Sequence, residues 1–159
     1  MSEEKLLKEI EDLSTQIKIN EFECRIIKES DWDMLVSWWK WWRWTVPAKD
    51  FLPENGTGGI IIEKGYHKTK DGIPIVAGFI YVTNSATTLL EWIVSNPDYK
   101  NKDRKLAIEM LITEAENLTK QSGYNYIFSV GRSKHLIATH KKLGWFVDDK
   151  PSHEITKKL

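Results

Sequence analysis

Three consecutive stretches rich in β-branched and aromatic residues constrain the fold more than any other feature of this chain. They cover residues 59–64, 73–83 and 87–95, and only short turns separate them. The first turn contains Asp71-Gly72, a dipeptide typical of hairpins. Because a parallel connection needs about a dozen residues or more, such short turns join antiparallel neighbours. The sequence therefore predicts a three-stranded antiparallel meander.

Helical patterns precede and follow the meander. Residues 23–27 alternate as in a strand, and Ser30 then stands as the N-cap of a helix that continues through the tryptophans of residues 38–44. After the meander, a helical apolar face ends at Gly123 and is formed by Ala107, Leu111, Ile112, Ala115 and Leu118.

The end of the chain predicts further short elements. These are a strand at residues 126–130, a helix at 136–143 closed by Gly144, and two final strands at 145–148 and 153–157. This order of helices and strands is typical of an α+β domain with a mostly antiparallel sheet, which would cover residues 21–159.

The first 20 residues form a separate amphipathic segment. Leu6, Ile10, Leu13 and Ile17 recur at helical spacing with charged residues between them, which predicts a helix at residues 3–17. We expect this helix to pack on the surface of the domain. Self-association, giving a homodimer, is the alternative, although two heptads alone form a marginal coiled coil.

Charge and cysteine content argue against several classes of protein. Lys plus Arg and Asp plus Glu each number 23, so the zero net charge disfavours a nucleic-acid partner without excluding it. Residues 1–95 hold 11 basic and 15 acidic side chains, whereas residues 96–159 hold 12 and 8, so an anionic ligand would prefer the C-terminal half. Cys24 is the only cysteine, which rules out an internal disulfide and a cysteine metal cage.

The sequence also predicts a cytoplasmic location, no membrane partner and no metal site. The N-terminus is acidic, and no stretch approaches the ~18 consecutive apolar residues that indicate a membrane span. The four histidines have no neighbours at the spacing of metal ligands.

Residues 89–145 carry a resemblance to a known family. The stretch from Lys102 to Ala107 is similar to the Gln/Arg-x-x-Gly-x-Gly/Ala turn of the GNAT acyltransferases, with Lys105 in place of the central glycine. Residues 133–145 resemble the Asn-x-x-Ala-x-x-x-Tyr-x-x-x-Gly-Phe segment of that family. The stretches ESDWDML, FLP and LLEWIVSNP also resemble GNAT-related proteins of tailed phages, which would place this protein in the host cytoplasm.

The resemblance implies a GNAT fold with splayed middle strands that binds acetyl-CoA and passes its acetyl group to an amine acceptor of unknown class. The backbone of Ile93, Val94 and Ser95 would pair with the pantetheine arm, and Ser133 stands at the family's asparagine position. The amides that would hold the pyrophosphate belong to Lys102, Asp103, Arg104, Lys105, Leu106 and Ala107.

Two catalytic side chains are also implied. Glu91 lies 11 residues before Lys102, a spacing similar to that of the general-base glutamate in some members, and apolar neighbours would raise its pKa. His140 stands where the family often has the tyrosine that protonates the departing thiolate. A solvated strand-edge glutamate and a surface histidine are the alternatives. The missing glycine and tyrosine leave a second function open, a catalytically silent binding module.

Five tryptophans fall within residues 38–44. At helical spacing, Trp38, Trp41 and Trp42 share a stripe with Leu35, which predicts the core face, whereas Trp39 and Trp44 lie away from it. We therefore expect Trp39 and Trp44 to bind the acceptor by stacking. Covering the N-terminal helix or a dimer partner is the alternative.

Overall fold

A five-stranded sheet forms the centre of the molecule. The computed structural model describes residues 2–65 and 72–159, apart from the side chains of residues 14–20. The strands lie in the order of the sequence and are β1 (Phe22–Ile26), β2 (Gly59–Lys64), β3 (Ile73–Val82), β4 (Thr87–Ser95) and β5 (Tyr126–Phe128). The pairs from β1 to β4 are antiparallel, so the predicted meander is confirmed. The Asp71-Gly72 turn lies partly outside the described residues.

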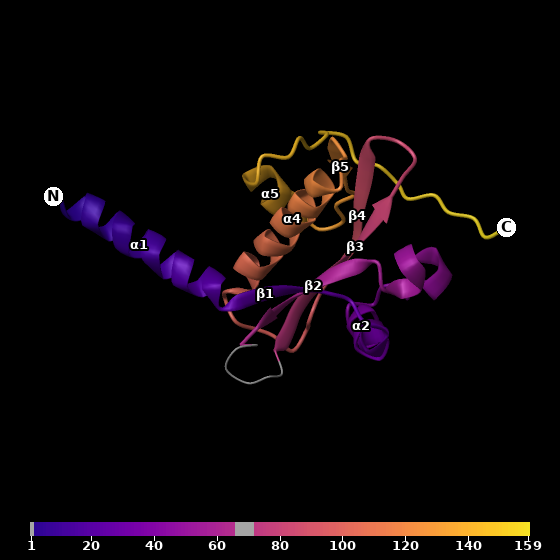
Figure 1. Ribbon diagram of the computed structural model, residues 1–159, viewed down its shortest axis with the longest axis horizontal. Coiled ribbons are helices and arrows are strands. Elements are labelled where there is room, and N and C mark those ends of the chain that lie inside the picture. Colours follow the sequence, from indigo (N-terminus) through magenta and orange to yellow (C-terminus); the bar gives the residue numbers. More distant parts are fainter. Residues whose placement is uncertain (1, 66–71) are drawn as a thin grey trace.

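Both faces of the sheet are covered, because successive side chains of a strand point to opposite sides. Ile60 and Ile62 of β2 pack with the helix α4 (Arg104–Gln121), whereas Ile61 between them packs with α2 (Trp32–Trp41). Figure 1 shows α4 and the short helix α5 (Lys134–Lys142) together, away from α2. The fold is α+β, as predicted.

A bulge in β4 interrupts its regular pairing with β3 in the middle of the sheet. Ala77 of β3 pairs with Val94, but Phe79, two residues on, pairs with Glu91, three residues back. The extra residue lies at Trp92, whose φ of 57° is rare for a side chain of this size. On its other edge, β4 pairs with β5 in parallel and only over Thr87–Leu89. The half of β4 that carries Glu91 is therefore free of β5.

The two strands predicted after residue 144 are wrong. Residues 143–159 contain no strand, and Phe146 and Ile155 are each 92% exposed. The edge strand that directly precedes this segment is β5, which has only three residues and offers a short edge for a ladder. The end of the chain consequently runs as an irregular tail.

The first helix, α1 (Glu3–Asn20), extends from the rest of the molecule at the N-terminal end of β1 (Figure 1). Its apolar residues Leu6, Ile10 and Leu13 are 49%, 54% and 64% exposed, so the domain does not cover them and the prediction of packing is wrong for these three. Self-association through α1 stays a prediction. No helix in the described part of the chain is long and apolar enough to cross a membrane.

Candidate active site

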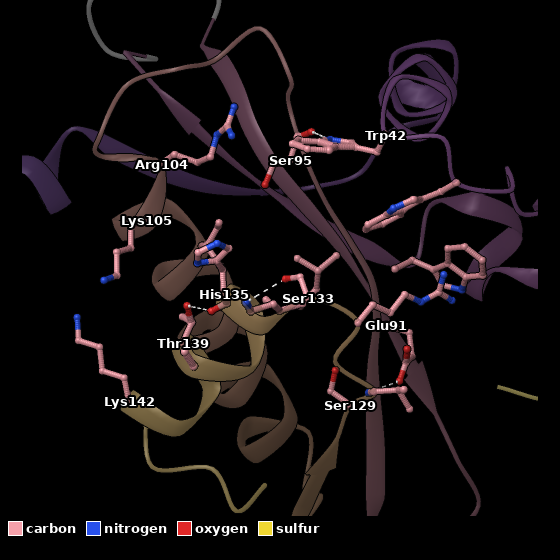
Figure 2. Close-up of a pocket in the computed structure, with 18 of the residues that line it drawn as sticks. Trp42, Glu91, Ser95, Arg104, Lys105, Ser129, Ser133, His135, Thr139 and Lys142 are labelled. Atoms are coloured by element: carbon pink, nitrogen blue, oxygen red, sulfur yellow. Dashed lines mark hydrogen bonds between the residues drawn. The ribbon is translucent and has the colours of Figure 1, made fainter. Parts of the chain in front are cut away.

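A cleft of about 710 Å³ opens where β4 and β5 part. One wall is the free half of β4, and the other is formed by the segment after β5 together with α5. The start of α4 closes one end, and Trp42 and Trp44, which follow α2, lie along the β4 side. In the close-up, Lys105 and Lys142 lie at one end of the cleft and Glu91 at the other, with His135 and Ser133 between them (Figure 2).

Glu91 carries the chemistry that is easiest to assign. It lines the cleft two residues beyond the last residue of β4 that pairs with β5, and its Oε1 accepts a hydrogen bond from Val130 N at 3.0 Å. Burial is the largest cause that raises the pKa of Glu91 to about 7, and the negative charge of Glu154 adds to it. The Val130 hydrogen bond and the charge of Arg132 act in the opposite direction. A carboxyl group with this pKa can accept a proton near neutral pH.

Cationic side chains gather at the other end of the cleft. Lys102 and Lys105 are exposed and line it at the start of α4, and Lys142 joins them from α5, where its Nζ lies 2.6 Å from Glu109. The guanidinium of Arg104 also lines the cleft but donates to the carbonyls of Asn96 and Tyr99. Arg104 therefore has a structural task at this turn.

The backbone at the start of α4 offers two amides to an anion. Arg104 N donates to Asn101 O at 3.2 Å, and Ala107 N donates to Asp103 O at 3.1 Å. Lys105 and Leu106 lie between these bonded positions, in the first turn, where a helix supplies no internal acceptor. The predicted contribution of the Ala107 amide is wrong, because that amide is used within the helix and Ala107 is fully buried.

Asp103 does not present its side chain to the cleft. Its carboxylate accepts hydrogen bonds from Lys64 Nζ at 2.5 Å and from Tyr99 Oη at 2.6 Å, and it is buried. These contacts fix the turn that precedes α4 against β2. Its amide donates to Asn101 Oδ1 at 3.2 Å, so the prediction that this amide holds the pyrophosphate is also wrong.

In the strand that was predicted to pair with the pantetheine arm, alternate side chains face the cleft and the core. Ile93 and Ser95 line the cleft, whereas the side chain of Val94 points to the opposite face and packs with α2. The carbonyl of Ser95 accepts a hydrogen bond from Trp42 Nε1 at 2.9 Å (Figure 2). Ser133 also lines the cleft, and its Oγ caps α5 by accepting from Leu136 N at 3.1 Å.

His140 does not line the cleft, so the predicted delivery of a proton to a thiolate there is wrong. Its ring is buried edge-on against Trp145, with centroids 4.6 Å apart, and Nδ1 donates to the carbonyl of Leu136 at 2.8 Å. Burial lowers its pKa, which favours the neutral ring. The ring of His140 packs against Trp145, which follows α5, whereas its neighbour Thr139 lines the cleft.

The structure separates the two tryptophans that were expected to bind an acceptor. Trp44 lines the cleft. Trp39 is fully buried, which makes its predicted role in acceptor binding wrong. The predicted stripe is wrong, because Trp41 is 58% exposed; the buried face is Leu35, Trp38 and Trp39, which have the spacing of one face of a helix.

The lining residues that the sequence analysis did not assign to the site include Ser129, Arg132 and His135. They follow β5, and the carboxyl ends of adjacent parallel strands lie at the same edge of a sheet. If the sequence analysis had predicted that β5 runs parallel to β4, it would have placed these residues near Glu91. Among the described residues, no three His, Cys, Asp or Glu side chains lie together as metal ligands would.

Fold and cleft together define the class of protein, an α+β domain with the GNAT acetyltransferase fold, as predicted. No family model and no curated protein sequence matches this chain. Among solved structures, it is similar to an aminoglycoside acetyltransferase from an uncultured soil metagenomic sample, with a TM-score of 0.58, 9% identity and coverage of 88% of this chain and 98% of that one.

Two further solved structures have the same fold. Glucosamine-6-phosphate N-acetyltransferase from Arabidopsis thaliana gives a TM-score of 0.57 at 14% identity, over 86% of this chain and 97% of that one. AAC(6')-Iy in complex with the bisubstrate analogue CoA-S-monomethyl-acetylneamine gives 0.54 at 16% identity, over 87% and 99%. At these identities the likeness concerns the fold.

Proposed function

We propose that this protein is an N-acetyltransferase that uses acetyl-CoA and acetylates an amine. The observation that carries the proposal is a single cleft with cations at one end and a half-buried carboxyl group of raised pKa at the other. Acetyl-CoA has the matching polarity, with phosphates at one end and a reactive thioester at the other. One of the proteins with this fold was solved with a CoA-derived bisubstrate analogue, which supports the proposal.

The cationic end suits the phosphates of CoA. Lys102, Lys105 and Lys142 would supply positive charge, and the amides of Lys105 and Leu106 would donate to a pyrophosphate at the start of α4. The pantetheine arm would then follow the free edge of β4 past Ser95 and Ile93 toward Glu91. A glycine at position 105 would let the backbone approach the pyrophosphate closely. Lys105 would instead attract the pyrophosphate with its positive charge.

Glu91 would act as the general base. Bound acetyl-CoA would supply a thioester carbonyl for the attack of an amine nitrogen. An amine is protonated near neutral pH, so its ammonium must first lose a proton, and the carboxylate of Glu91 can accept it. The transfer would form a C–N bond and break the C–S bond, and the thiolate would take the second proton that the nitrogen loses. The products are an amide, free CoA thiol and the proton on Glu91, which returns to solvent.

Calorimetry with acetyl-CoA tests the cofactor site, and release of free thiol in the presence of amines tests the reaction. We expect micromolar binding and amine-dependent thiol release. No heat of binding at millimolar acetyl-CoA would contradict the whole proposal. Tight binding without thiol release from any amine would instead favour a catalytically silent binding module, which the position of His140 outside the cleft also favours.

Reversal of charge at position 105 should weaken cofactor binding. In Lys105→Glu, we expect the Kd for acetyl-CoA to rise by about 10-fold or more, because an attraction to phosphate becomes a repulsion near a helix start. The effect should diminish as salt is raised, since salt screens exposed charges. Lys120→Glu, an exposed lysine in the last turn of the same helix, is the matched control and should bind normally. Equal Kd values for the two variants would place the phosphates elsewhere.

A further inference from the structure

Arg132 occupies a distinctive position at the Glu91 end of the cleft. Its guanidinium carbon lies 5.1 Å from the ring centroid of Trp92 and 5.8 Å from that of Trp44, and all three side chains line the cleft. It stands two residues beyond Val130, whose amide donates to Glu91. An acceptor that reaches Glu91 would therefore also meet the guanidinium of Arg132.

The partner of Arg132 comes from a part of the chain that is loosely held. Arg132 Nη2 donates to Glu154 Oε2 in the irregular tail, and both side chains are about 40% exposed, at 41% and 42%. Every residue from Asp148 to Leu159 is exposed, and residues 143–159 contain no helix or strand. An exposed ion pair of this kind contributes little to stability, so a ligand carboxylate can displace it.

The tail is easier to displace than Arg132. Two cation–π contacts hold the guanidinium, and the backbone next to it is fixed by the Val130–Glu91 hydrogen bond. Glu154 has no comparable support in an all-exposed segment. An incoming group therefore takes the place of the Glu154 carboxylate and not the place of the guanidinium between the rings.

The cations of the cleft have different tasks at its two ends. Lys102, Lys105 and Lys142 lie at the end that suits CoA phosphates, and Arg104 donates to the carbonyls of Asn96 and Tyr99. Arg132 lies at the other end, where its charge acts on Glu91. Arg132 is therefore the lining cation that is left for the acceptor.

We propose that Arg132 binds a carboxylate of the acceptor in place of Glu154, and that the substrate is an amine that also carries a carboxylate and an aromatic or other planar group. This inference rests on the proposed function. The guanidinium fork matches a carboxylate with two parallel hydrogen bonds. Trp44 and Trp92 also line the cleft, so the planar group would pack against the parts of their rings that the guanidinium does not cover. Glu91 lies at the same end of the cleft and would take the proton of the amine.

The test compares phenylalanine, tyrosine and tryptophan as free amino acids with their carboxamides, using thiol release from acetyl-CoA. We expect at least one free amino acid to exceed its carboxamide in kcat/KM by about 10-fold or more. In Arg132→Gln, kcat/KM for that amino acid should fall by about 10- to 100-fold, while the carboxamide changes little. Glu154→Gln should raise kcat/KM for the amino acid, because the competing carboxylate is gone.

Asp149→Asn, an exposed acid on the same tail, is the matched control and should leave the kinetics unchanged. The inference would be overturned if the carboxamides had a kcat/KM equal to or above that of the free amino acids, or if Arg132→Gln kept the preference of the original protein. Turnover of the aminoglycoside sisomicin, with no turnover of any amino acid in the panel, would also overturn it. If neither the amino acids nor their carboxamides were acetylated while acetyl-CoA still bound in calorimetry, the inference would fail but the proposed cofactor site would not. Absence of acetyl-CoA binding is the separate result that removes the proposed function.

Discussion

Replacing Glu91 with glutamine is expected to lower kcat for amine acetylation by about 10²-fold or more, the usual effect of losing a general base. Binding of acetyl-CoA should be unchanged, since Glu91 lies at the opposite end of the cleft from the lysines. The amide oxygen of glutamine can still accept the hydrogen bond from Val130 N, so the variant should fold normally. Steady-state rates at saturating acetyl-CoA, with calorimetry on both proteins, measure these effects.

The dependence of the rate on pH separates a base from a structural residue. Because burial raises the pKa of Glu91 to about 7, kcat/KM of the original protein should fall as pH drops below about 7, where the carboxylate becomes protonated. Glu91→Gln should lack this limb. Glu11→Gln, which alters an exposed carboxylate on α1, should keep both the rate and the limb. A limb that persists in Glu91→Gln would assign the base to another group.

The same pKa has a consequence for stability. The folded value of about 7 lies above the ordinary value of 4.5, so unfolding releases a proton between these two pH values and becomes easier as pH rises through them. The stabilising effect of the neutral carboxyl group is complete below about pH 4.5 and lost above about pH 7. Glu91→Gln should accordingly melt at a higher temperature than the original protein at pH 8 but not at pH 4.

The elements that the sequence predicted well are those set by local pattern. The meander follows from alternation and short turns, and α4 follows from an apolar face closed by Gly123, which adopts a φ of 86°. Glu91 could be identified because its apolar neighbours in the same strand indicate burial, and the structure buries it for that reason. Each of these depends on residues that are close in the chain.

The parts that could not be predicted depend on contacts between distant residues. The bulge at Trp92 lies opposite Gly78 of β3, and an interior glycine can indicate a bulge but does not say which residue of the neighbouring strand is the extra one. Arg132 meets Trp44 and Trp92 only because β5 returns parallel to β4. Trp39 was misassigned because the stripe was drawn through Trp41, whereas Trp39 lies four residues after Leu35 and so shares its face of α2, and Trp41 points away from it.

Trp39 tests this corrected view of the aromatic cluster. Its indole is stacked on Phe79 with centroids 6.1 Å apart and meets Trp32 and Trp92 edge-on at 5.8 and 6.2 Å. Because it is fully buried, Trp39→Ala would leave a large cavity between α2 and the sheet. We expect the free energy of unfolding to fall by about 3–5 kcal/mol, with a melting temperature lower by about 10 °C or more.

Trp41→Ala is the matched control, because it removes the same side chain two residues further along α2. Trp41 is 58% exposed and its ring meets that of Trp42 with centroids 4.7 Å apart, so its loss should cost about 1 kcal/mol. Denaturant titration of both variants measures the difference. Trp39→Phe, which keeps an aromatic ring in the cluster, should fall between them. If Trp39→Ala were as stable as Trp41→Ala, the indole could not be filling the space between α2 and Phe79, and its assignment to acceptor binding would have to be reconsidered.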